Sequence, residues 1–133
     1  MKVVPIKIEA GITGFESPAA EYQELGLSLD ELLIQHPNAT FVGVATGDSM
    51  IGCGIFDGDI LIVDRALEPH QGDVIVANFN GVFTCKIFDK QRGMLISSSP
   101  HYPPILVNKG DTFQYEGVVS TSVRLHRARK ALF

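Results

Sequence analysis

Short runs rich in Val, Ile, Phe and Thr alternate with turns rich in Gly, Asp and Pro along the chain after residue 37. Runs of this length and composition are typical of β-strands. Asn80-Gly81 separates two of them and predicts a tight hairpin, because both residues tolerate the positive φ of a type I′ turn. We therefore expect a compact, mainly β domain of mostly antiparallel strands. The expected strands are residues 40–45, 60–63, 74–78, 82–88, 94–97 and 116–120.

Two short helices are expected before these strands. Ser17-Pro18 is a favoured helix start, and the segment AAEYQEL at residues 19–25 would end at Gly26. Ser28 begins a capping box for a second helix, LDELLIQ, at residues 29–35. This second helix is acidic, whereas a DNA-reading helix-turn-helix needs a basic recognition face. We therefore expect no sequence-specific DNA binding.

Length and composition are those of one folded domain: 133 residues, of which 45% are hydrophobic and 20% charged. The formal net charge of -4 disfavours non-specific binding to nucleic acids, which usually needs a basic surface. No run approaches the ~20 apolar residues that cross a bilayer, and the first ten residues lack the apolar core of a signal peptide. These features predict a cytoplasmic protein with no membrane partner.

Two smaller features complete the composition. The only cysteines, Cys53 and Cys85, lack the spacing of a zinc site or a disulfide framework, so we interpret them as small hydrophobic residues and expect no metal or cofactor. Positive charge gathers near the C-terminus, and we interpret this segment as a solvent-exposed end, with a contact for DNA or an acidic partner as the alternative. Its basic residues are Arg124, His126, Arg127, Arg129 and Lys130.

A candidate nucleophile lies in the turn Gly47-Asp48-Ser49-Met50, between an expected strand and a glycine-rich segment. A serine at such a junction can project its hydroxyl, while the backbone N–H groups of Asp48 and Ser49 stabilise an oxyanion. Many Gly-x-Ser turns have no catalytic role, so a base is also needed. The four histidines, which occupy no recognisable triad positions and are expected at the surface, are His36, His70, His101 and His126.

A lysine interrupts the apolar strand VFTCKIF. Alternation places Lys86 on one face with Thr84 and Phe88, and Cys85 on the other. One interpretation is that Lys86 extends along a half-buried strand to reach solvent. The other is that burial lowers the pKa of its amine, so that neutral Lys86 removes the proton of a serine hydroxyl. The residues alone leave both interpretations open.

Four motifs together resemble the LexA/UmuD-type family of serine–lysine autoproteases: Gly47-Asp48-Ser49-Met50, Asp57-Gly58-Asp59, Gly72-Asp73 and Phe83-Thr84-x-Lys86. The resemblance runs in order from Gly11 to about Val119. It implies the C-terminal β domain of that family, with Ser49 as nucleophile and Lys86 as general base. We interpret Asp57 and Asp59 as turn residues without a catalytic role.

The resemblance also implies that the chain cuts its own N-terminal arm at a small residue followed by glycine. Two bonds fit, Ala10–Gly11 and Thr13–Gly14. Side-chain size favours the first, because a pocket for a methyl group rejects a β-branched threonine, whereas spacing from the segment FESPAAEY favours the second. We prefer Ala10–Gly11, which gives an arm of residues 1–10 and a peptidase and partner-binding domain of residues 11–133. Either choice leaves a short arm.

In function, the resemblance implies an SOS-response accessory protein that cleaves itself on a RecA–single-stranded DNA filament. The trimmed homodimer would then join a UmuC-type error-prone polymerase in translesion synthesis. The alternative is a non-cleaving protein-binding module of the same fold with an idle dyad, which the short arm keeps open. A signal peptidase of the same chemistry is disfavoured because no anchor segment is recognised, and a repressor would need a DNA-reading domain.

Overall fold

The computed structural model describes residues 2–3 and 27–127, and the chain divides into two compact units, Met1–Gln35 and His36–Phe133. In the first unit, β1 (Lys2–Val3) pairs antiparallel with β2 (Leu27–Ser28), and α1 (Leu29–Leu33) follows directly. The helix expected at residues 19–25 lies outside the described residues.

Helix α1 is shorter than the expected 29–35. Ser28 is its N-cap, but the Ser28 side chain makes no capping hydrogen bond to the described residues, so the expected capping box is wrong. Ile34 already has extended backbone angles, with φ -121° and ψ 108°. Pro37 disfavours a helical conformation of the residue before it, so the chain must leave the helix early in this region.

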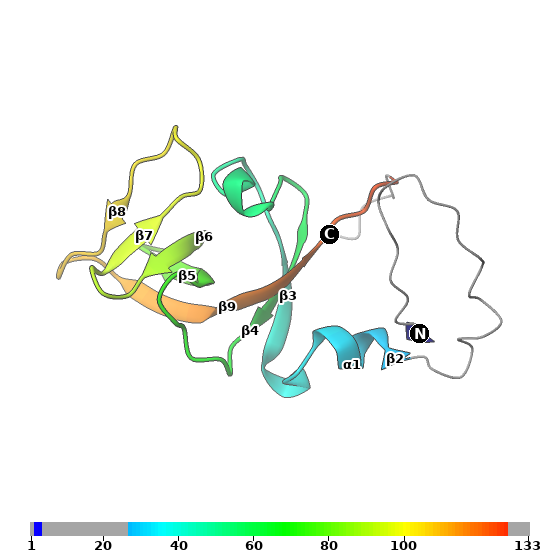
Figure 1. Ribbon diagram of the computed structural model, residues 1–133. Helices are drawn as coiled ribbons and strands as arrows, with labels where there is room; N and C mark the ends of the chain where they lie inside the picture. Colours follow the sequence, from blue (N-terminus) through cyan, green and yellow to red (C-terminus); the bar gives the residue numbers. More distant parts are fainter. Residues whose placement is uncertain (1, 4–26, 128–133) are drawn as a thin grey trace. The chain divides into compact units, whose positions relative to one another are not determined.

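The second unit contains one seven-stranded sheet in which every pair of neighbours is antiparallel (Figure 1). This confirms the expected mainly β fold. The strand order is β3-β4-β9-β5-β6-β7-β8, so β3 is an edge strand. The strands are β3 (Thr40–Val44), β4 (Ile60–Asp64), β5 (Val74–Phe79), β6 (Val82–Asp89), β7 (Met94–Ile96), β8 (Ile105–Leu106) and β9 (Phe113–Val123), and the 3-10 turns are Pro37–Ala39 and Ile51–Cys53.

Strand β9 links the two halves of the sheet, and it runs past both β5 and β4 in Figure 1. It was expected only at residues 116–120, but its first half pairs with β5 and its second half with β4, and these partners extend it at both ends. Gly117 lies at the irregularity between the halves. A Cβ atom there would be only 2.6 Å from Cγ1 of Val63 and 3.0 Å from the Asp64 carbonyl oxygen, so this close approach to β4 requires glycine.

The hairpin between β5 and β6 has the predicted turn. Asn80 and Gly81 both have positive φ, 51° and 87°, as a type I′ turn requires. Phe79 pairs with Val82 across the turn, which fixes the register along both strands. Further along the hairpin, this register places Lys86 opposite Ile75, a residue with no exposed surface.

The core has two clusters of buried side chains. The first, near β3, β4 and the turn after β3, consists of Met50, Ile55, Leu61, Val63 and Val76. The second consists of Ile75, Ala77, Leu95 and Val118. Met50 therefore anchors the turn that carries Ser49 in the first cluster. Among the described residues, no helix has the length and apolar character needed to cross a membrane.

Candidate active site

Ser49 and Lys86 lie in contact, although 37 positions separate them in the sequence. Lys86 belongs to β6, and Ser49 lies in the turn that follows β3. Nζ of Lys86 donates a hydrogen bond to Oγ of Ser49 at 2.8 Å. This distance is within the range for direct proton transfer between a base and a hydroxyl.

Hydrogen bonds on both sides of Ser49 hold its turn in place. On the N-terminal side, Gly47 adopts a positive φ of 84° and donates its N–H to Oδ1 of Asp57 at 2.8 Å. On the C-terminal side, the backbone of Ser98 accepts from Gly52 N–H and donates to the carbonyl of Ser49, both at 2.8 Å. The expected turn role of Asp57 is thus confirmed, and its carboxylate stabilises the turn that carries Ser49.

The surroundings of Lys86 make its amine easier to deprotonate. The side chain is half-buried, and this loss of hydration lowers the pKa of the amine from its ordinary value of 10.5. The nearby Cys85 acts in the opposite direction and more weakly. Burial raises the pKa of the Cys85 thiol to about 11, so this sulfur stays protonated near neutral pH and is a poor nucleophile.

The backbone amides of Asp48 and Ser49 are available to a ligand. Within the described part of the chain, neither N–H donates a hydrogen bond to another protein group. Ile51 N–H, by contrast, donates to the Asp48 carbonyl at 3.4 Å. Two unengaged N–H groups beside a nucleophile can stabilise the negative oxygen of a tetrahedral intermediate.

A cavity of about 460 Å³ opens beside the two side chains. One wall comes from β3 and the turn after it, and the other from residues 83–86 of β6. Its floor is apolar and includes Met50, Ile55, Leu61, Val63 and Val76. Because β3 has no strand partner on one side in the described sheet, its outer edge can accept an additional strand along this cavity.

A second hollow of about 310 Å³ shares Phe41 and Phe83 with the first cavity. Arg65 and Glu116 line it and form an ion pair at 3.8 Å, so the second hollow has a pair of opposite charges in its lining. The Phe83 side chain between the hollows is exposed.

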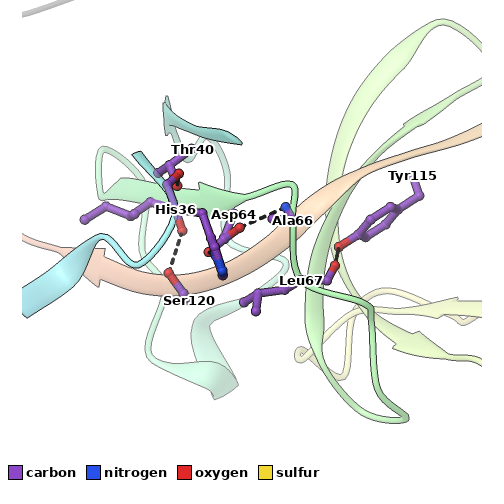
Figure 2. A network of polar contacts seen from close by, with 8 residues as sticks. His36, Thr40, Asp64, Ala66, Leu67, Tyr115 and Ser120 are labelled. Atoms are coloured by element: carbon purple, nitrogen blue, oxygen red, sulfur yellow. Dashed lines mark hydrogen bonds and ion pairs between the residues drawn. The ribbon is translucent and has the colours of Figure 1, made fainter. Parts of the chain in front are cut away.

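One of the four histidines, His36, lies at the surface with 43% of its side chain exposed and also contacts a buried carboxylate. Figure 2 shows His36 against the buried Asp64, with Nδ1 of His36 2.6 Å from Oδ2 of Asp64. Asp64 also accepts from Ala66 N–H at 2.9 Å, and Thr40 Oγ1 donates to the His36 carbonyl at 2.7 Å. His36 thus supplies a polar partner for the buried Asp64 carboxylate, which would be costly to bury without one. The histidines exposed as expected are His70, His101 and His126.

Two expectations about single residues were wrong. Arg124 is not part of a wholly solvated end, because its guanidinium binds the buried carboxylate of Asp59. Cys53 is exposed, so it does not pack as the small hydrophobic residue that was expected. Cys85, in contrast, packs against the first core cluster. The candidate scissile residues, Ala10 with Gly11 and Thr13 with Gly14, lie outside the described residues.

Two contacts of the turn that carries Ser49 had no signal in the sequence. The backbone of Ser98 and the hydroxyl of Tyr102 reach the turn from the loop after β7. Tyr102 Oη donates to Oδ1 of Asp48 at 2.6 Å. Both residues lie in the serine-rich and proline-rich segment at residues 97–104, whose composition predicts only a loop. No local pattern pairs this segment with residues 48–52.

Known proteins resemble the chain over most of its length. The sequence profile of the Peptidase S24-like family matches residues 2–120. Protein SamA of Salmonella typhimurium is 39% identical over 126 residues, which cover 94% of this chain and 86% of SamA. Protein MucA of Salmonella typhimurium is 32% identical over 125 residues, which cover 92% and 86% of the two chains. A LexA repressor of Stenotrophomonas maltophilia is 39% identical over 83 residues, which are 61% of this chain and 39% of the repressor. With this extent of match, the chain belongs to the S24 peptidase family, of the UmuD/LexA type.

Proposed function

We propose that the chain is a self-cleaving serine endopeptidase in which Ser49 is the nucleophile and Lys86 the general base. The observation that carries this proposal is the 2.8 Å contact between Lys86 Nζ and Ser49 Oγ in a setting that lowers the pKa of the amine. A lysine that loses its proton more readily can activate a serine hydroxyl, which is otherwise a weak nucleophile.

In the acylation step, the proton of Ser49 Oγ moves to neutral Lys86 as Oγ attacks the scissile carbonyl carbon. The carbonyl oxygen becomes negative, and the N–H groups of Asp48 and Ser49 donate to it. When the carbon–nitrogen bond breaks, the leaving amine takes the proton from Lys86. The products of this step are a free new N-terminus and an ester between Ser49 and the arm.

In the second step, Lys86 removes a proton from a water molecule that attacks the ester carbonyl. Ser49 leaves as its alkoxide and recovers a proton from Lys86, so the dyad returns to its first state. The arm departs with a new carboxyl end. Because the substrate belongs to the same protein, tethering replaces substrate affinity as the source of proximity.

The pattern of the arm supports Ala10–Gly11 as the bond that is cut. In an extended strand, alternate side chains lie on one face. The residues that precede this bond on the face of Ala10 are Ile8 and Ile6, so that face is apolar throughout. An arm that docks along the edge of β3 with this face inward would match the apolar floor of the cavity.

The competing bond, Thr13–Gly14, gives a less favourable face. There the alternate positions before the bond are Thr13, Gly11 and Glu9. This face offers no large apolar side chain, and a charged carboxylate would have to enter an apolar groove without a partner. We therefore assign residues 1–10 to the removable arm and residues 11–133 to the peptidase and partner-binding domain.

The cellular part of the proposal rests on the family likeness. We assign the chain to the SOS response in the cytoplasm, where a RecA–single-stranded DNA filament favours the docked pose of the arm. After cleavage, a homodimer of the trimmed chain joins a UmuC-type polymerase for translesion synthesis. The resemblance to SamA and MucA over most of their length supports this assignment more than the partial match to a LexA repressor does.

Intact-mass measurement of the full chain, with and without an activated RecA filament, tests the proposal. The expected product begins at Gly11, and the Ser49→Ala and Lys86→Ala variants should remain uncut while keeping the fold. A product that begins at Gly14 would refute the choice of bond but not the dyad. An uncut wild-type chain under all conditions would favour the non-cleaving binding module.

A further inference from the structure

Asp48 places a carboxylate directly beside the two backbone N–H groups that the proposed reaction needs. Aspartate side chains readily accept hydrogen bonds from nearby backbone N–H groups, particularly those of the following residues in a turn. A carboxylate in that position would occupy the oxyanion donors of Asp48 and Ser49. It would also repel the negative oxygen that forms there.

In the structure, the Asp48 carboxylate is engaged elsewhere. Tyr102 Oη donates to Oδ1 of Asp48 at 2.6 Å, and no backbone N–H of the described residues donates to this carboxylate. The pKa of Tyr102 is raised, first by this hydrogen bond and then by the charge of Asp48. The phenol therefore keeps its proton at neutral pH and remains a donor.

The loop that carries Tyr102 is itself hydrogen-bonded to the turn that carries Ser49. Ser98 N–H donates to the Ser49 carbonyl, and Gly52 N–H donates to the Ser98 carbonyl. Tyr102 N–H in turn donates to the Ser99 carbonyl at 3.3 Å. The phenol is thus presented to Asp48 by a loop that already contacts the turn on the other side of Ser49.

We propose that Tyr102 is a positioning residue that holds the Asp48 carboxylate away from the backbone N–H groups of Asp48 and Ser49, so that they stay free for the oxyanion. This inference rests on the proposed function, since it assigns those groups to the oxyanion. The alternative is a purely structural role for Tyr102, in which its hydrogen bond to Asp48 only stabilises the turn that carries Ser49.

Three variants of the full chain separate the two roles: Tyr102→Phe, Asp48→Ala with Tyr102→Phe, and Tyr115→Phe as a matched control. Tyr115 Oη also donates a 2.6 Å hydrogen bond, to the Leu67 carbonyl, away from the dyad (Figure 2). Tyr102→Phe should slow self-cleavage on the order of tenfold, because loss of a single oxyanion donor costs ~10²–10³-fold and competition by Asp48 is only partial. Tyr115→Phe should cleave at the wild-type rate.

The double variant decides between the roles. If Asp48 is the competitor, its removal should restore most of the rate that Tyr102→Phe lost. If Tyr102 only stabilises the turn that carries Ser49, the double variant cleaves as slowly as Tyr102→Phe, and the proposal is overturned. A Tyr102→Phe variant that cleaves at the wild-type rate overturns it equally.

A second measurement does not depend on cleavage. In the uncut Ser49→Ala chain, amide proton shifts of residues 48–50 are compared by NMR at neutral pH with and without Tyr102→Phe. With Tyr102→Phe added, one of these amide protons should move downfield because the released Asp48 carboxylate accepts its hydrogen bond, and adding Asp48→Ala should abolish the movement. If the amide shifts are alike with and without Tyr102, the inference fails, whereas an uncut wild-type chain by itself contradicts only the proposed function.

Discussion

Arg124 binds both carboxylate oxygens of Asp59, with Nε 2.8 Å from Oδ1 and Nη2 2.9 Å from Oδ2. Asp59 is 1% exposed, so its charge depends on this partner. The same guanidinium donates to the Gly54 carbonyl at 2.8 Å and lies 4.2 Å above the centroid of the Phe56 ring. Through Arg124, the segment after β9 thus binds the loop that connects the turn carrying Ser49 to β4.

Arg124→Ala should destabilise the fold, because it leaves a buried carboxylate without its cation. We expect a drop in Tm of several degrees at pH 7. Arg127→Ala, the control, removes an exposed arginine that forms no ion pair within the described residues, and it should leave Tm nearly unchanged. Equal Tm values for the two variants in thermal unfolding would contradict the role of Arg124.

The effect of Arg124→Ala should depend on pH. The hydrogen bond from Arg124 lowers the pKa of Asp59 below its ordinary 3.8. A carboxyl group with a lowered folded-state pKa contributes stability above the unfolded value, and this contribution is lost as pH falls through the folded value. The difference in Tm between wild type and Arg124→Ala should therefore be full above about pH 5 and shrink below 3.8.

The strands could be predicted from the sequence because their signals are local. Alternation and turn residues located six of the seven strands in the large sheet, and Asn80-Gly81 predicted a hairpin that the φ angles confirm. The strand β8 was missed because two residues carry no periodicity. Strand β9 was underestimated because its ends are set by pairing with β4 and β5 rather than by its own residues.

The pairing of Ser49 with Lys86 could be predicted from the sequence only through the motifs that resemble a known family. Neither Ser49 nor Lys86 is distinctive alone, and their contact depends on how β6 and the turn after β3 meet in the fold. The contacts that stabilise the turn carrying Ser49 and the loop after it could not be predicted from the sequence. Tyr102 lies 54 positions from Asp48, and Arg124 lies 65 positions from Asp59. Such pairs follow from tertiary packing and leave no spacing in the sequence.

Gly52 lies so close to Ser98 that any larger residue must shift either the turn that carries Ser49 or the loop that contacts it. A Cβ atom at position 52 would overlap Ser98 Oγ and lie 2.6 Å from the Ser98 carbonyl oxygen. Overpacking of this kind costs ~1–3 kcal/mol of stability. Because a shift of about 1 Å in a reacting group can cost ~10²-fold in rate, Gly52→Ala should slow self-cleavage by about that factor.

The matched control for Gly52→Ala is Gly110→Ala, where a Cβ atom meets nothing within 4 Å. Initial cleavage rates and Tm are measured for both variants. Gly110→Ala should match wild type in both. If Gly52→Ala cleaves as fast as wild type, the contact with Ser98 does not position Ser49.

At pH values where Lys86 is charged, its burial should lower the free energy of unfolding of the protein. Burial lowers its pKa from 10.5, so the unfolded chain binds this proton more tightly than the folded chain. Wild-type stability should therefore rise with pH between the folded-state pKa and 10.5. Lys86→Met removes the group, so the variant should be more stable than wild type at pH 7, and this advantage should shrink across that interval.

Chemical unfolding of wild type and Lys86→Met at several pH values measures this difference. The same substitution at the exposed Lys109 is the control and should show no comparable advantage at pH 7. If Lys86→Met is less stable than wild type at pH 7, the ammonium form is favoured by the site, and the case for a neutral base is weakened.

The rate of self-cleavage should rise with pH, since only the neutral form of Lys86 accepts the proton of Ser49. Below the folded-state pKa, each pH unit raises the neutral fraction, and hence the rate, roughly tenfold. Lys86→Arg keeps the positive charge but its guanidinium stays protonated, so this variant should lose at least ~10²-fold at every pH tested. Initial rates from intact mass between about pH 6 and pH 10 give the profile. A flat profile would mean that another group accepts the Ser49 proton. A Lys86→Arg variant that cleaves at the wild-type rate would mean the same, because arginine, unlike lysine, does not lose its proton here.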